Sequence, residues 1–192
     1  WWRFQVPITV AAGCAAASGA IIVGAMTAMP LPQAHIAALV LAAVCGLAVF
    51  VLAMRWDASD RTRETRRSDI AFWLHLLAAP LLVHPVVSLL GVLDGTAGRG
   101  AWLAMIALYA VVGVVSLAID RRALLVSALG YVLYAFNSIL KTYGVVSLSF
   151  ALTALLIGSA LLLLSVFWHP IRRWALRCLP GALLRYLPPA LA

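Results

Sequence analysis

The chain has 192 residues, of which 65% are hydrophobic and 10% charged, and its mean hydropathy is +1.06. A soluble domain is about 45–50% apolar and about 25% charged, and a domain of this size leaves roughly a third of its surface in water. This composition excludes a soluble enzyme, a disordered segment and a nucleic-acid-binding domain. The net charge of +8 comes from basic residues between apolar segments, which suits anionic lipid headgroups better than nucleic acid.

Six apolar segments are long enough to cross a bilayer as helices, which takes about 20 residues each. In chain order they cover residues 8–29, 36–54, 70–93, 102–119, 123–140 and 150–168. Strands are excluded because the segments do not alternate apolar and polar residues, and an open sheet leaves unpaired edges in lipid. We therefore predict an all-α polytopic membrane bundle of six transmembrane helices over residues 1–168, followed by a cytoplasmic interfacial tail over residues 169–192.

The first two segments carry small residues at every fourth position. These rows are Ala12, Ala16, Ala20, Gly24 and Ala28 in the first segment, and Ala38, Ala42 and Gly46 in the second. Small residues let helix backbones approach closely, which promotes helix association in lipid. We expect the two helices to contact each other through these rows, in a tight hairpin over the turn at residues 30–33.

The loop between the second and third segments, residues 55–69, contains five arginines and four acidic residues. Its spacing predicts a solvated helical extension with Asp57–Arg61 and Glu64–Arg67 pairs. Ser68 or Asp69 is the expected N-cap of the third helix.

The basic residues also predict the orientation, because short loops rich in Lys and Arg stay in the cytoplasm. Twelve of the 14 Lys and Arg residues fall on one side of the six segments, and only Arg99 and Lys141 fall on the other. Both termini are therefore expected in the cytoplasm, and the expected location is a bacterial inner membrane.

The third and fifth segments hold most of the polar side chains at membrane depth. His84 and Asn137 each lie 14 residues into their segments, about 21 Å deep at 1.5 Å per residue. Tyr134, Asn137 and Lys141 share one helix face by their spacing, and Asp94 is placed to pair with Lys141. These five residues form the candidate substrate or ion site, because polar groups inside a membrane usually mark function.

Pro80 and Pro85 lie on either side of this depth in the third segment. Each proline removes a helical hydrogen bond and bends the helix, so both are predicted hinge positions and the third helix is expected to be broken. The alternative is structural: His84 and Asn137 form an interhelical hydrogen bond, which is worth about 0.6 kcal/mol on average in membranes.

Catalytic and cofactor chemistry find little support in the sequence. The six acidic residues lie in loops or at segment ends, and no nucleophile–base cluster can be assembled. His75 and His84 are nine residues apart on one helix and point about 180° apart, so they cannot ligate one haem. His75 and His169 are the remaining pair, and His169 has a simpler role at a helix C-terminus. We expect no enzyme activity, no metal and no cofactor.

The tail begins with a short amphipathic helix. Arg172, Arg173, Trp174 and Arg177 are the expected headgroup anchors of this helix, which lies in the membrane surface.

Two functions follow. The first is a structural or accessory subunit, or a scaffold. Its expected partners are the bilayer, anionic headgroups and either another membrane protein or further copies of itself, and we expect it to bind no nucleic acid. The alternative is a small oligomeric transporter or channel, with its site where the third helix faces the fifth.

Overall fold

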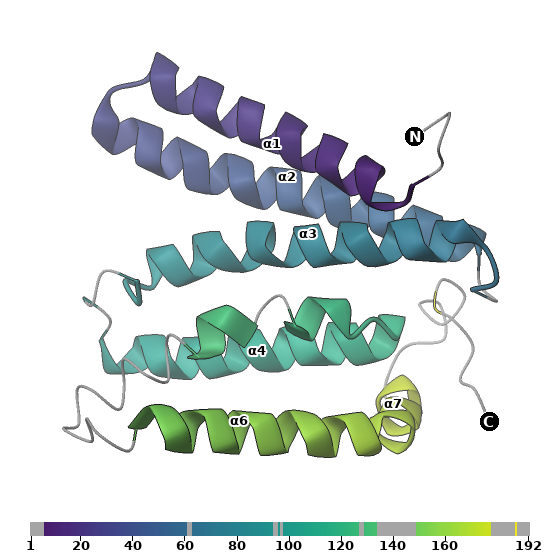
Figure 1. Ribbon diagram of the computed structural model, residues 1–192. Helices are drawn as coiled ribbons and strands as arrows, with labels where there is room; N and C mark the ends of the chain where they lie inside the picture. Colours follow the sequence, from purple (N-terminus) through teal and green to yellow (C-terminus); the bar gives the residue numbers. More distant parts are fainter. Residues whose placement is uncertain are drawn as a thin grey trace. The chain divides into compact units, whose positions relative to one another are not determined.

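The computed structural model describes residues 6–60, 63–93, 96, 98–126, 129–133, 149–177 and 187. All regular elements in these residues are α-helices, as the sequence predicts. They are α1 (Ile8–Ala28), α2 (Leu31–Ser59), α3 (Arg66–Leu89), α4 (Arg99–Ile119), α6 (Ser149–Val166) and α7 (Trp168–Arg177) (Figure 1). Residues 123–126 and 129–133 are also helical.

Three of the described helices are long and apolar enough to cross a membrane, namely Ile8–Ala28, Gln33–Ser59 and Arg66–Leu89. A fourth is added if the bent pair Leu155–Val166 and Trp168–Arg177 counts as one span. The apolar part of α4, Leu103–Ile119, is shorter than these helices. The helices are compatible with an integral membrane protein, and the six-span count remains a prediction.

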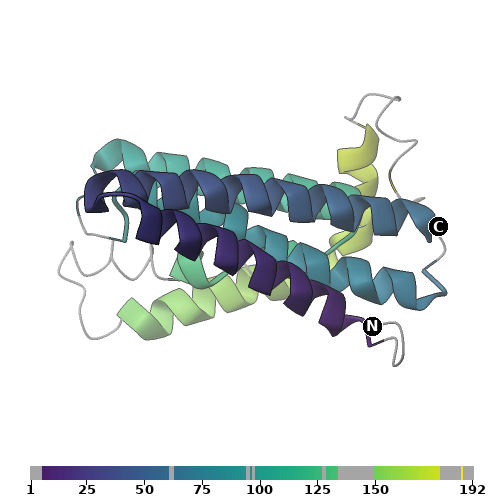
Figure 2. The same cartoon turned by 90° about the horizontal axis from the view of Figure 1, so that it is seen from above.

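The chain divides into two units, residues 1–86 and 87–192. In the first unit, α1 and α2 form an antiparallel hairpin over Met29 and Pro30 (Figures 1 and 2). Pro30 has an extended backbone, so the chain changes direction there between α1 and α2. Its carbonyl oxygen accepts a hydrogen bond from the Ala34 N–H at 2.9 Å. The predicted hairpin is therefore confirmed.

The face of α1 that is covered differs from the predicted one. Ala11 and Ser18 are the buried residues of α1, whereas the predicted row of Ala12, Ala16, Ala20, Gly24 and Ala28 is exposed along its whole length. Two residues of a helix turn through about 200°, so Ala20 points away from the side on which Ser18 is buried. Small side chains allow helices to approach closely, but they do not decide which of several faces lined with small residues contacts the neighbouring helix.

The small residues of α2 face α3 at one point. A Cβ atom added to Gly46 would lie 2.9 Å from the Leu81 Cβ and 3.0 Å from the Leu81 carbonyl carbon. Around this contact, Val49 and Ala53 of α2 pack with Ile70, Leu74 and Ala78 of α3 and with Ala11 of α1 in one buried cluster. The absence of a side chain at Gly46 thus sets how closely α2 and α3 approach.

The helix α3 continues through Pro80 and Pro85, and both prolines lie inside its bounds. Helical geometry is therefore kept across both positions, in contrast to the expected broken helix. Each proline removes one helical hydrogen bond, and the packing of α3 against α2 stabilises the helical turns before and after the prolines. Hinge motion at the two prolines stays a prediction.

In the second unit, the chain bends by 72° between α6 and α7 (Figures 1 and 2). The bend falls at Phe167, one residue before the predicted end of the sixth segment. Trp168, the first residue of α7, is buried with Leu117 of α4 and Leu125. The predicted tail helix is therefore present, and it contacts both α4 and α6.

The close approach at Gly46 predicts the effect of adding one methyl group there. The substitution Gly46→Ala should destabilise the protein by about 1–3 kcal/mol, because the new Cβ meets both side chain and backbone of Leu81. Thermal unfolding in detergent, followed by circular dichroism, measures the change.

The matched control is Gly19→Ala in α1, where an added Cβ meets nothing within 4 Å. It should leave the stability unchanged or raise it by up to about 1 kcal/mol, because alanine is the better helix former. Equal destabilisation by both substitutions would contradict the packing at Gly46.

Candidate functional site

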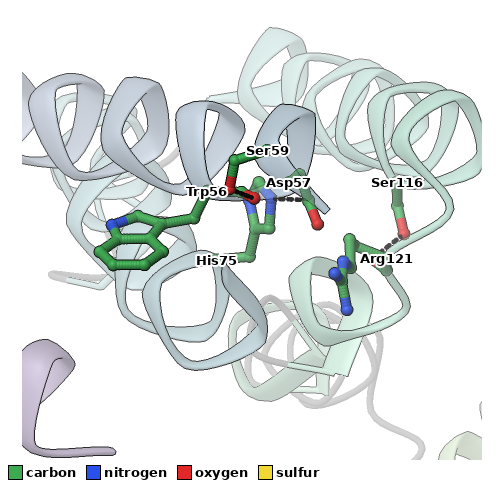
Figure 3. A network of polar contacts seen from close by, with 6 residues as sticks. All are labelled: Trp56, Asp57, Ser59, His75, Ser116 and Arg121. Carbon is green, nitrogen blue, oxygen red and sulfur yellow. Dashed lines mark hydrogen bonds and ion pairs between the residues drawn. The ribbon is translucent and has the colours of Figure 1, made fainter. Parts of the chain in front are cut away.

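A buried histidine and a buried aspartate meet between α2 and α3 (Figure 3). The His75 Nε2 lies 2.9 Å from the Asp57 Oδ2, and the two side chains are 0% and 6% exposed. A carboxylate only accepts hydrogen bonds, so the His75 Nε2 carries the proton and donates it to Asp57.

The positions of the two residues follow from where the helices end. The predicted second segment stops at residue 54, but α2 continues to Ser59 and carries Asp57 within helical geometry. The third helix begins at Arg66, four residues before the predicted segment. The predicted pairing of Asp57 with Arg61 stays a prediction, because Arg61 lies outside the described residues. Asp57 contacts His75.

Apolar side chains surround this pair. The Phe50 ring meets the His75 ring edge to face, with centroids 5.4 Å apart and planes at 66°. Phe50, Leu74 and Ala78 belong to the cluster that forms the core of the first unit. The His75 Nδ1 is buried, and no described residue gives it a hydrogen-bond partner. A buried polar atom without a hydrogen bond costs free energy.

Directly after α2, the carboxylate of Asp60 organises the turn into α3. It accepts hydrogen bonds from the Thr65 hydroxyl at 2.6 Å, the Thr65 N–H at 3.0 Å and the Glu64 N–H at 3.3 Å. Arg63 takes a left-handed backbone conformation with φ 60°. Residues 55–59 and 66–69 of the predicted helical extension are helical, as parts of α2 and α3, and the Asp60 carboxylate caps the described residues between them.

The start of α3 also differs from the predicted N-cap. The Thr65 hydroxyl accepts a hydrogen bond from the Arg67 N–H at 3.3 Å, which is the geometry of an N-cap residue. Ser68 and Asp69 lie inside the helix. Three polar residues within five positions, Thr65, Ser68 and Asp69, all suit a cap, so the sequence alone did not separate them.

The hydrogen bonds to Asp60 change its acidity. The Thr65 hydroxyl, followed by the backbone N–H groups of Thr65, Glu64 and Ser68, holds the pKa of Asp60 below its ordinary value, against the opposing effect of burial. The carboxylate is therefore ionised throughout the neutral and mildly acidic range.

Of the five residues of the predicted substrate or ion site, the structure describes one. The structure places His84 on an exposed position of α3. Asp94, Tyr134, Asn137 and Lys141 lie outside the described residues. The polar recess between the third and fifth segments therefore stays a prediction, and His84 is not among the residues that surround the Asp57–His75 pair.

In the second unit, Arg172 has a different environment from the one expected. It was predicted to contact headgroups, but it is 2% exposed and its Nε donates to the Leu117 carbonyl oxygen at 3.1 Å. The same nitrogen lies 3.7 Å from the Asp120 Oδ1. A cation at the last carbonyls of a helix is favourable, so Arg172 ties α7 to the C-terminal end of α4.

A second contact adds to this tie: the Trp168 Nε1 donates to the Asp120 Oδ1 at 2.6 Å. At the end of α4 itself, the Ser116 hydroxyl donates to the Arg121 carbonyl oxygen at 2.6 Å (Figure 3). Asp120 has a left-handed backbone, φ 58°, which ends α4. Arg173, Trp174 and Arg177 are exposed on α7, and their contact with headgroups stays a prediction.

The sequence reasoning missed the Asp57–His75 contact and the role of Arg172. The sequence did contain a signal for the Asp57–His75 contact. His75 lies inside the apolar third segment, near its start, and a histidine there needs a hydrogen-bond partner. The only acids near that boundary are those of residues 55–69.

The chemistry open to the Asp57–His75 pair is limited by its neighbours. The nearby Ser59 hydroxyl donates to the Trp56 carbonyl oxygen at 2.7 Å (Figure 3). A His–carboxylate pair activates a nucleophile only when that nucleophile lies within hydrogen-bond reach of the histidine. Among the described residues, no group of three or more His, Cys, Asp or Glu side chains could hold a metal ion. The geometry is that of a structural contact between two helices.

Comparisons with known proteins add no relative: no family model matches the chain, and no curated protein or solved structure gives a significant match.

Removing one partner of the Asp57–His75 pair should be costly. The substitution His75→Phe keeps a ring beside Phe50 but removes the donor to Asp57, and we expect a loss of about 3–5 kcal/mol in the free energy of unfolding. Adding Asp57→Leu should recover most of this loss, because no buried charge is then left without its partner.

Denaturant unfolding in detergent measures this cycle, with Ser59→Ala as a control that changes an exposed hydroxyl. Losses that simply add in the double variant would show that the two side chains do not act as a pair.

The lowered pKa of Asp60 predicts how the turn responds to acid. The stability that this carboxylate provides is fully present above its ordinary pKa and is lost as the pH falls through the lower pKa of the folded protein. The substitution Asp60→Asn should therefore lower the unfolding temperature at neutral pH, with the difference from wild type shrinking in strong acid.

Glu64→Gln, which removes an exposed acid from the same turn, should leave the pH profile as in wild type. Thermal unfolding between pH 7 and pH 2 measures both variants. A constant difference between wild type and Asp60→Asn over this range would contradict the assignment.

Proposed function

We propose that this chain is an integral membrane protein that acts by packing, as a non-catalytic accessory subunit or scaffold, and that α1 is the helix through which it contacts a transmembrane helix of a partner protein. The observation that carries the proposal is the exposed row of small residues on α1, Ala12 to Ala28 at every fourth position. It lies on the far side of α1 from the contact with α2.

Helix association in lipid needs a surface that permits close approach. Small residues provide it, because lipid tails give no hydrophobic driving force between helices. Gly13 and Gly24 have no atom within 4 Å of an added Cβ, so this side of α1 is open in the described chain. The buried side chains of Asp57, His75 and Arg172 contact neighbouring helices, which also favours a packing role over chemistry.

The setting of this contact follows from the distribution of basic residues. We infer six spans, both termini in the cytoplasm and a bacterial inner membrane, because twelve basic residues fall on one side and two on the other. The Asp60 turn then lies on the cytoplasmic side. The transport alternative depends on His84, Asp94, Tyr134, Asn137 and Lys141, and the last four lie outside the described residues.

The proposal predicts what a bulky side chain on the exposed row does. Ala16→Leu and Ala20→Leu should each weaken the complex with the partner by about 1–3 kcal/mol, roughly fivefold to a hundredfold in affinity, because they force the helices apart. Blue-native electrophoresis of the protein in mild detergent, from its native membrane, measures the mass of the complex.

The control is Ala15→Leu, which adds the same group to an exposed position of α1 off the row. We expect it to keep the wild-type mass, while the two row variants run at lower mass. A chain that runs alone in wild type, or row variants that keep the full mass, would refute the proposal.

A further inference from the structure

Arg122, in the turn after α4, is held in place from two sides. Its guanidinium carbon lies 4.8 Å from the centre of the Trp168 ring, and its NH1 donates to the Ser165 hydroxyl at 2.9 Å. Arginine stacks on aromatic rings through its planar face. The edge of the guanidinium, where its N–H groups point, is therefore left for a second partner.

The stack is itself fixed by the core of the second unit. Trp168 is buried, and its indole N–H is bonded to Asp120. Arg122 is exposed, but it stacks on the buried Trp168 ring. Because the side chain is already held in place, less conformational entropy is lost when a ligand binds. A positioned arginine of this kind can form two parallel hydrogen bonds to a phosphate.

The charges around Arg122 favour an anion. Within residues 117–126 and 165–177 there are five arginines and one acidic residue, Asp120. Asp120 is engaged by Trp168 and Arg172, so it offers little compensation to Arg122. Arg173 and Arg177 on the exposed face of α7 add to the positive potential, which attracts anionic lipids.

An apolar stripe on α6 ends at the same place. Leu155, Leu162 and Val166 are 64%, 70% and 72% exposed, and their spacing places them on one face of the helix. Ser165 lies beside them, three residues after Leu162. A ligand with a phosphate at Arg122 thus has an apolar surface for a hydrocarbon chain directly next to it.

We propose that Arg122, fixed on the Trp168 ring and by Ser165, binds the phosphate of an anionic phospholipid whose acyl chain lies along the α6 stripe of Leu155, Leu162 and Val166. The site is separate from the α1 row and does not depend on a protein partner. It also differs from the predicted anchor, because Arg172 is buried and a residue outside the tail provides the main contact.

Native mass spectrometry of the purified full-length protein tests the site. Phosphatidylglycerol and phosphatidylcholine with the same acyl chains are titrated separately, and the first bound lipid is measured. Arg122→Gln should weaken phosphatidylglycerol binding about tenfold, since charge-assisted hydrogen bonds are lost, and leave phosphatidylcholine binding unchanged. Arg122→Lys should lie between, because it keeps the charge but loses the planar stack.

The matched control is Arg67→Gln, which removes the same charge from an exposed arginine of α3 and should reduce binding by less than about twofold. Ser165→Ala, a milder change, should weaken phosphatidylglycerol about twofold to threefold through the lost hydrogen bond. Circular dichroism checks the fold, and if Arg122→Gln does not fold, Arg122→Lys and Ser165→Ala decide the question.

Three results would overturn the proposal: equal losses for Arg122→Gln and Arg67→Gln, an equal loss for phosphatidylcholine, or displacement of phosphatidylglycerol by millimolar inorganic phosphate. The last would identify a site for a free anion in place of a lipid.

Discussion

The contact between Asp57 and His75 shows the constraint on which the rest of this fold depends, because polar groups enclosed by apolar helices must find their partners within the protein. The two side chains meet at 2.9 Å inside the core of the first unit. To bring them together, α2 has to extend as far as Ser59 and α3 has to begin at Arg66. The Asp60 turn, capped by Thr65, closes the short connection that this geometry requires.

The second unit meets the same constraint in another way. At the C-terminal end of α4, the Leu117 carbonyl oxygen accepts a hydrogen bond from Arg172 of α7, and the Asp120 carboxylate accepts one from the Trp168 indole N–H. Polar ties of this kind lie near helix ends, while α1 and α6 present mostly small or apolar residues on their exposed sides. Such a surface suits contact with lipid and with other helices, which is why a packing role and a headgroup site are proposed here and a catalytic one is not.

The pattern of apolar segments predicted the described helices well, because segment length and hydropathy are local properties of the chain. The helix ends were less predictable: α2 continues five residues beyond residue 54, through a polar stretch that is stabilised by tertiary contacts. The partner of Asp57 was also missed, since spacing favours local pairs and His75 lies 18 residues away. The used face of α1 could not be chosen from the sequence, because several of its faces carry small residues.

The central claim is that the helices cross a membrane, and α2 tests it most directly because its two ends are described. Gln33 and Glu64 are exposed near opposite ends of the segment, and each can be replaced by cysteine after the native cysteines are changed to alanine. A membrane-impermeant maleimide should label the cysteine at position 33 in intact spheroplasts and the one at position 64 only after lysis. Labelling of both from the same side would contradict a membrane-spanning α2.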